Sequence, residues 1–146
     1  MFPTAGFMET WDTMFKGTYT DLALPPTRDI RAVGDFLQPK MDFFFTVTAG
    51  LVNPQGSLHG GAIATLVDHL TSAHLTPQIR TGSVSVDLHV AYHAPAAVGD
   101  EVRLESHILR VGNRVCFTEA KLYRTKDGVL IATSLHTKAV TAKPKL

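Results

Sequence analysis

The chain has 146 residues, of which 45% are hydrophobic and 18% charged, a composition typical of one folded domain and not of a disordered chain. Its 14 Lys and Arg residues nearly balance its 13 Asp and Glu residues, so no charge excess indicates nucleic acid or an anionic membrane as a partner. The single cysteine, Cys116, cannot form an internal disulfide, which favours a reducing compartment.

The first 40 residues carry the weakest pattern, and we treat residues 1–40 as an N-terminal extension of the same domain. Apolar residues from Met8 to Phe15 recur at helical spacing and predict a short amphipathic helix. No secretory signal is recognisable, so we expect an intracellular, cytoplasmic protein, with a peroxisomal or mitochondrial location left open. No stretch of the chain predicts a membrane span.

Residues 41–75 predict a strand followed by a helix. Aromatic and β-branched residues indicate a strand over 41–48. The cluster Asn53-Pro54-Gln55-Gly56 predicts a turn. A helix is predicted over 58–75, and its apolar residues fall on nearly every face, which is typical of a buried helix.

The remaining residues predict strands. Strict alternation over 83–92 indicates a strand with one apolar and one polar face. Gly112-Asn113 and Asp127-Gly128 predict hairpin turns between the later strands. Those strands are expected over residues 101–111, 114–125 and 129–140. One helix among antiparallel strands predicts an α+β fold, with a meandering sheet wrapped around the helix.

Two glycines stand in the first turn of the predicted helix, where alanine would be the better helix former. Gly60 and Gly61 let another group approach the backbone closely. The first-turn N–H groups have no helical acceptor and carry the positive end of the helix dipole, so they can hold a carbonyl oxygen that becomes an oxyanion. Tight packing against a strand is the alternative interpretation.

Asp68 lies in the middle of the same apolar helix. A buried carboxylate is unfavourable unless it is paired, and burial raises its pKa toward that of a useful general base. We expect a buried catalytic carboxylate, and a hydrogen-bonded structural Asp is the alternative. Asp68 follows His59 by nine residues, about 13 Å along a helix axis, so one chain cannot easily bring both to one small group. In a two-fold dimer, Asp68 can face the partner's Gly60.

Three further polar residues lie near these positions. Asn53 and His59 flank the turn into the helix, and both side chains can donate a hydrogen bond to a carbonyl there. A turn-stabilising Asn and a capping His are the alternatives. Ser85, on the polar face of the predicted strand 83–92, either holds a water or is simply exposed. No zinc, phosphate-loop, dinucleotide or serine-elbow motif is present, so neither a metal nor a cofactor is expected.

The segment from Asn53 to Asp68, with His59-Gly60-Gly61 inside it, is followed by Val84-Ser85-Val86-Asp87-Leu88. This combination resembles the hotdog-fold acyl-CoA thioesterases, nearest in pattern to the phenylacetate-pathway and medium-to-long-chain acyl-CoA type. The resemblance implies a long central helix wrapped by a curved antiparallel sheet, which makes residues 41–146 a hotdog thioesterase domain. It also implies a homodimer or homotetramer with the active site at the subunit interface.

The resemblance assigns roles to the candidate residues. It implies that the Gly60 N–H, assisted by Asn53 and His59, polarises the thioester carbonyl. Asp68 of the other subunit is then the general base or the nucleophile, and Ser85 helps to place the water. The residues expected to bind the rest of the substrate, including the coenzyme A phosphates, are Gly61, Arg80, Arg114 and Lys138.

We therefore expect a cofactor-free enzyme that hydrolyses an acyl-CoA to the free acid and coenzyme A. Two other functions remain open: hydrolysis of acyl groups on acyl carrier protein, and non-catalytic binding of acyl-CoA. The presence of Asn53, His59, Gly60 and Asp68 together argues against the non-catalytic module. A hotdog dehydratase would place an Asp/His pair differently at the helix start. The sequence does not predict the length or shape of the acyl group.

Overall fold

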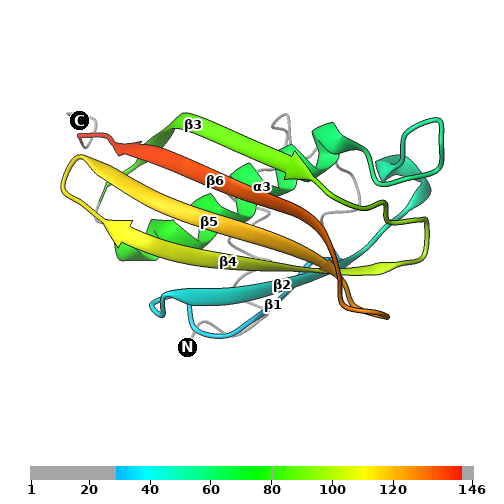
Figure 1. Ribbon diagram of the computed structural model, residues 1–146. Helices are drawn as coiled ribbons and strands as arrows, with labels where there is room; N and C mark the ends of the chain where they lie inside the picture. The colour runs from blue at the N-terminus through cyan, green and yellow to red at the C-terminus, as the bar shows by residue number, and fades with distance from the viewer. Residues whose placement is uncertain (1–28, 80, 143–146) are drawn as a thin grey trace.

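A computed structural model describes residues 29–79 and 81–142 of the chain, in which one curved sheet wraps around one long helix (Figure 1). The helix is α3 (Gly60–Leu75), flanked by the short 3-10 turns η2 (Ala49–Leu51) and η3 (Thr76–Gln78). The strands are β1 (Arg31–Val33), β2 (Lys40–Thr46), β3 (Ser83–Tyr92), β4 (Glu101–Val111), β5 (Val115–Arg124) and β6 (Val129–Val140). The expected α+β architecture is confirmed. No helix in the described ranges is long and apolar enough to cross a membrane.

The predicted elements are recovered with small shifts at their ends. The helix begins at Gly60 instead of residue 58, because His59 already has extended backbone angles and caps it. Strand β1 was not predicted, since three residues are too few to show a period. It lies within residues 1–40, the N-terminal extension predicted from the sequence, and it pairs with β2. The helix predicted around Met8 to Phe15 lies outside the described residues.

The order of strands differs from a simple meander. Strands β4, β5 and β6 do pair in sequence, but β3 pairs with β6 and not with β4. The sheet order is β1-β2-β4-β5-β6-β3, and every pairing is antiparallel. Strand β3 is therefore an edge strand in the described chain, with one side of its backbone unpaired.

A bulge in β3 breaks the strict alternation predicted for that strand. The register shifts between Ser85 and Asp87, so Ser85 pairs with Lys138 while Leu88 pairs with His136. Both partners on β6 face the helix, as their contacts with it show. Since directly paired residues share a face, Ser85 and Leu88 both face α3. The bulge thus turns a residue from the predicted polar face toward the helix.

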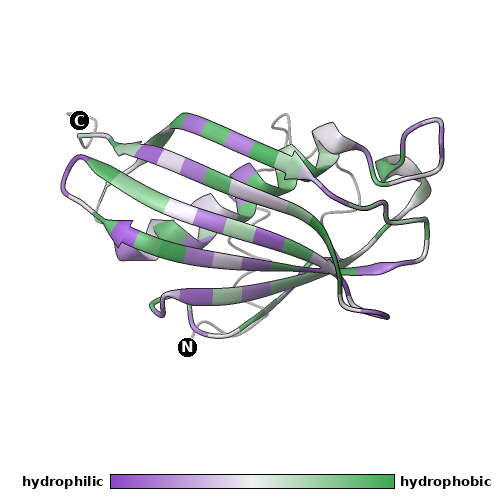
Figure 2. Cartoon of the chain, in the orientation of Figure 1, coloured by the Kyte–Doolittle hydropathy of each residue, from purple (hydrophilic) through white to green (hydrophobic). Residues whose placement is uncertain are grey.

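The core lies between α3 and the concave side of the sheet. Leu66 and Leu70 of the helix are buried there with Phe43, Leu104 and Leu122 of the strands. Apolar and polar residues alternate along the strands, as Figure 2 shows. The opposite side of α3, which carries Asp68, is only partly covered by the described chain. The helix is therefore buried along one side and not all round, as its composition had suggested.

Candidate active site

Asn53 stabilises the turn before α3. Its side-chain oxygen Oδ1 accepts hydrogen bonds from the backbone N–H groups of Gln55 and Ser57, both at 3.1 Å. These contacts correspond to the turn-stabilising interpretation. They also fix the orientation of the amide, because Oδ1 must face the two N–H groups. The Nδ2 group is then the end of the side chain available as a donor.

His59 caps the helix. Its Nδ1 accepts a hydrogen bond from the Gly61 N–H at 2.8 Å, and its carbonyl oxygen accepts from the Ile63 N–H at 3.0 Å. These contacts correspond to the capping interpretation of His59. Because Nδ1 acts as an acceptor, the neutral ring carries its hydrogen on Nε2, which can still donate to a bound group.

Tyr92, at the end of β3, packs directly on Gly60. Its hydroxyl donates to the Gly60 carbonyl oxygen at 2.8 Å. A Cβ added at Gly60 would lie 3.1 Å from the Tyr92 Cζ, and one added at Gly61 would lie 3.1 Å from the His59 Nδ1. A side chain at either position would therefore be tightly packed against a neighbouring side chain, which would have to shift slightly. This is the packing interpretation, although the Gly60 N–H still has no acceptor within the helix.

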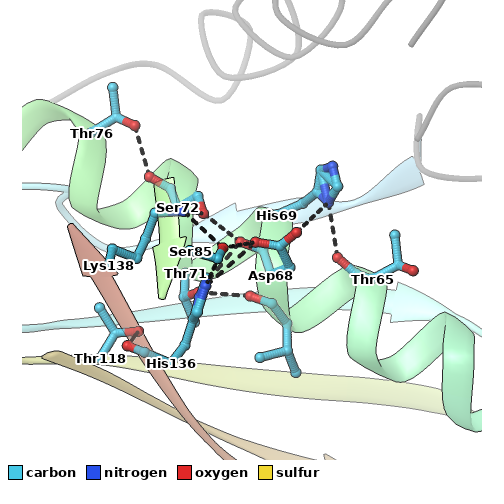
Figure 3. Close-up of polar contacts among 11 residues, drawn as sticks. Thr65, Asp68, His69, Thr71, Ser72, Thr76, Ser85, Thr118, His136 and Lys138 are labelled. Atoms are coloured by element: carbon cyan, nitrogen blue, oxygen red, sulfur yellow. Dashed lines mark hydrogen bonds and ion pairs between the residues drawn. The ribbon is translucent and has the colours of Figure 1, made fainter. Parts of the chain in front are cut away.

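Asp68 lies in a second polar cluster, about two turns further along α3 (Figure 3). The Ser85 hydroxyl oxygen lies 3.3 Å from Asp68 Oδ1, and His136 Nε2 lies 3.5 Å from the same oxygen. The expectation of a buried Asp68 is wrong for the single chain, since its side chain is 38% exposed. The reason is that the nearest strand, β3, is the sheet edge and covers only one side of it.

His136 was missed at the sequence level, and it is fully buried beside Ser85 and Thr71. Its Nε2 lies 2.8 Å from the Ser85 oxygen and its Nδ1 lies 2.7 Å from the Thr71 oxygen. Thr71 already donates its single hydrogen to the Val67 carbonyl at 2.7 Å, so Nδ1–H donates to Thr71 and Nε2 accepts from Ser85. A signal existed, because Ser134, His136 and Lys138 alternate on one face of the last strand.

The electrostatics of this cluster keep the imidazole neutral. Burial, aided by the charge of Lys138, lowers the pKa of His136 to about 4. Near neutral pH the ring is therefore an acceptor for the Ser85 hydroxyl. The Ser85 oxygen is left with lone pairs that can accept a hydrogen bond from a water beside the Asp68 carboxylate.

The predicted phosphate contacts are not gathered in one place. Lys138 is only 4% exposed, and its Nζ donates to Ser72 Oγ at 2.8 Å and to Ser85 Oγ at 3.5 Å, inside the Asp68 cluster. Lys138 therefore lies beside Asp68 and not on the open surface. Burial also lowers the pKa of its ammonium group, an effect that the Asp68 charge opposes. Arg114 is exposed at the β4–β5 turn, and Arg80 lies outside the described residues.

The two clusters do not meet within one chain. Asn53, His59 and Gly60 lie together at the helix start, whereas Asp68 lies eight residues after Gly60, about 12 Å along the axis, with Ser85 of β3 beside it. A thioester carbonyl is much smaller than this separation. One chain therefore holds the two polar clusters at two separate places along α3.

Comparison with known proteins identifies the family. Residues 55–131 match the Thioesterase superfamily. Acyl-coenzyme A thioesterase 13 of Mus musculus is 34% identical over 136 residues, covering 92% of this chain and 94% of that protein. The crystal structure of zebra fish thioesterase superfamily member 2 superposes with a TM-score of 0.84 at 25% identity, covering 97% of this chain and all of that one.

A more distant structure shares the fold alone. The PaaI protein of the E. coli phenylacetic acid degradation operon superposes with a TM-score of 0.75 at 16% identity, covering 96% of each chain. The sheet of six antiparallel strands around one long helix is the hotdog fold of these structures. With its family match and its near full-length relative, the chain belongs to the thioesterase superfamily.

Proposed function

We propose that the protein is an enzyme that hydrolyses acyl-CoA thioesters to the free acid and coenzyme A, with its active site shared between two subunits. Similarity to acyl-coenzyme A thioesterase 13 over nearly the whole chain supports the substrate class. The observation that carries the mechanism is the contact of Ser85 with both Asp68 and the neutral imidazole of His136, because it prepares a carboxylate and a hydroxyl oxygen to hold one water.

The helix start supplies the electrophilic half of the proposed site. The thioester carbonyl oxygen accepts from the Gly60 N–H, and the Asn53 Nδ2 and His59 Nε2 groups are additional donors at the same end of α3. These donors, together with the helix dipole, stabilise the negative charge that develops on this oxygen in the transition state. They are held in advance by the turn, the cap and the Tyr92 contact.

Asp68 and Ser85 of the other subunit supply the second half. Acting as a base, the Asp68 carboxylate removes a proton from a water that also donates to the Ser85 oxygen, and the resulting hydroxide adds to the carbonyl carbon. The C–S bond then breaks, and the thiolate of coenzyme A takes up a proton. Asp68 can instead attack the carbon directly and form an anhydride that water hydrolyses. The geometry supports either role.

The exposed edge of β3 supports a two-fold dimer. Val84 is 55% exposed and Val86 is 62% exposed, and one side of the strand's backbone has no partner in the described chain. Antiparallel pairing of β3 with its copy places Ser85 of one chain beside the far end of the other strand. Tyr92 lies at that end and contacts Gly60, so the same pairing brings Asp68 and Ser85 toward the partner's Gly60.

Complementation between two inactive variants tests this proposal. Asp68→Asn removes the basic oxygen, and we expect its turnover to fall by roughly two to four orders of magnitude, the usual weight of general-base catalysis. Gly60→Pro removes the backbone donor. Dimers that combine the two variants contain one intact site, so random pairing of equal amounts should recover about a quarter of wild-type thiol release.

Two results would contradict the proposal. Hybrid dimers that form but release no thiol would place both halves of the site within one subunit. Wild-type protein that binds acyl-CoA without releasing thiol would be a non-catalytic binding module. Asp87→Asn, on the opposite face of β3, is the control and should stay active.

A further inference from the structure

A pocket of about 340 Å³ opens beside the Asp68 cluster, between the second half of α3 and the start of β3. No aliphatic or aromatic hydrocarbon side chain is among its described lining residues, although the carbon atoms of the polar side chains form much of its surface. The lining residues are Asp68, His69, Ser72, Thr76, Thr81, Gly82, Ser83 and Lys138. At roughly 30 Å³ for a water-sized group, the pocket accommodates about ten non-hydrogen atoms. It lies where an acyl group attached to a thioester beside Asp68 can extend.

Lys138 brings an unpaired positive charge to this pocket. Within the described chain no carboxylate oxygen lies within 4.0 Å of its Nζ, although the side chain is 4% exposed. A buried charge is unfavourable unless an opposite charge or hydrogen bonds compensate it. Two of the three ammonium hydrogens point to the Ser72 and Ser85 oxygens, the latter at a long 3.5 Å. The third has no acceptor among residues 29–79 and 81–142.

Thr81 is a second donor without a partner on the same pocket. Its hydroxyl oxygen is buried and makes no hydrogen bond with the described residues. The neighbouring hydroxyls of Ser72 and Thr76 already donate to the carbonyl oxygens of Asp68 and Ser72, at 2.6 and 2.8 Å. Lys138 and Thr81 are therefore two donors of this pocket that a ligand can use, and a ligand group that pairs with both is an acceptor.

From the unpaired ammonium of Lys138 and the unpaired hydroxyl of Thr81, we infer that the enzyme selects acyl groups with a carboxylate at the end distant from the thioester. A carboxylate is an acceptor-only group with two oxygens, so it can accept from both donors and neutralise the buried charge. This inference rests on the proposed function, since the acyl group reaches the pocket only if its thioester lies at Asp68. An alkyl chain of equal length leaves both donors unpaired.

Matched substrates test this selection. Glutaryl-CoA and adipoyl-CoA are compared with valeryl-CoA and hexanoyl-CoA, which have the same numbers of acyl carbons. We expect wild-type kcat/KM to be at least tenfold higher for the carboxylated partner of each pair. Lys138→Met should reduce this ratio by roughly 10- to 100-fold, the value of a hydrogen bond to a charged group. Thr81→Val should also lower this ratio of kcat/KM values.

The control variant is Lys121→Met, since Lys121 is an exposed lysine that pairs with Glu119 on β5. It should leave the ratio unchanged. A wild-type enzyme that hydrolyses the alkyl substrates equally well would overturn the inference. So would a Lys138→Met variant in which both substrates lose the same factor, because Lys138 would then act only on Asp68 and Ser85.

A binding measurement separates this inference from the proposed function. Calorimetric titration of adipoyl-CoA and hexanoyl-CoA into Asp68→Asn protein, with and without Lys138→Met, gives the same ratio without hydrolysis. Equal affinities would overturn the carboxylate selection. If the wild-type protein hydrolyses no acyl-CoA but the affinities differ as expected, the proposed function fails and the pocket assignment stands.

Discussion

Single residues at the start of α3 each perform a structural task and leave one group free for chemistry. Asn53 uses Oδ1 for the turn, and His59 uses Nδ1 for the cap. Structural and catalytic interpretations of these residues are therefore compatible, because the two tasks use different atoms. A variant that removes the atom used in only one of the two roles can therefore distinguish the structural role from the catalytic role.

Asn53→Asp is the sharpest of these variants. An Asp side chain keeps an oxygen for the Gln55 and Ser57 N–H groups but replaces the Nδ2 donor with a second acceptor. We expect turnover to fall by roughly 100- to 1000-fold, as for loss of one oxyanion donor, with little change in the unfolding midpoint. Asn53→Ala should lower both turnover and stability. Full turnover in Asn53→Asp would exclude the amide as an oxyanion donor.

Gly60 and Tyr92 should be energetically coupled. A methyl group at Gly60 would meet the Tyr92 ring at 3.1 Å, so Gly60→Ala forces the ring or the helix start to move and should lower kcat. In Gly60→Ala/Tyr92→Leu the obstructing ring is absent, and the loss should be smaller than the sum of the two single losses in a double-mutant cycle. Gly50→Ala, where nothing lies within 4 Å of the added Cβ, is the control. Strict additivity would contradict the coupling.

At the scale of elements, two buried histidines join α3 to the sheet. His74 on the helix contacts the Ser106 hydroxyl at 2.9 Å and the Gln38 carbonyl at 2.8 Å. His136 on β6 contacts Thr71 on the helix at 2.7 Å. Burial lowers the pKa of both imidazoles, because protonation would place a charge in the core.

The helix–sheet contact should therefore weaken in acid. Unfolded His titrates near 6.5, and His136 in the folded state titrates at about 4, so between these values the unfolded chain binds more protons. The contribution of neutral His136 to the free energy of unfolding is fully present above pH 6.5 and decreases as the pH falls toward 4. For His136 the loss is on the order of 3 kcal/mol. Urea unfolding across this range should show the decline.

His136→Gln provides the comparison, because glutamine keeps hydrogen-bonding groups but does not titrate. This variant should show a shallower decrease in unfolding free energy between pH 6.5 and 4. An unchanged slope would mean that His136 does not account for the acid sensitivity.

For the whole molecule, the decisive feature is the position of β3 at the sheet edge, where Asp68 remains partly exposed. In the dimer that we propose, a second copy paired along this edge would cover the apolar side chains of the strand and the uncovered side of α3. The same two-fold symmetry would bring the two halves of the proposed site together. Loss of the dimer would then also mean loss of activity, since each proposed site needs both chains.

A charge on the β3 edge should separate the subunits and abolish activity together. Val86→Lys introduces an ammonium group at a position that is 62% exposed in one chain and covered in the proposed dimer. We expect a monomer in sedimentation, a native-like circular dichroism spectrum and loss of thiol release. Leu109→Lys, at an apolar position on β4 that is 53% exposed, should remain dimeric and active. An active monomer would disprove the shared site.

The sequence by itself determined the helix, most strands and the helix-start residues, because local periodicity, turn residues and caps act between near neighbours in the chain. The tertiary structure alone decided that β3 lies beside β6, that a bulge turns Ser85 toward Asp68, and that His136 and Lys138 join them. The contacts that His136 and Lys138 make with Ser85 and Ser72 connect residues 51 to 66 positions apart, and all of these features depend on strand order and register. No local pattern specifies that order, since it results from packing the whole sheet around α3.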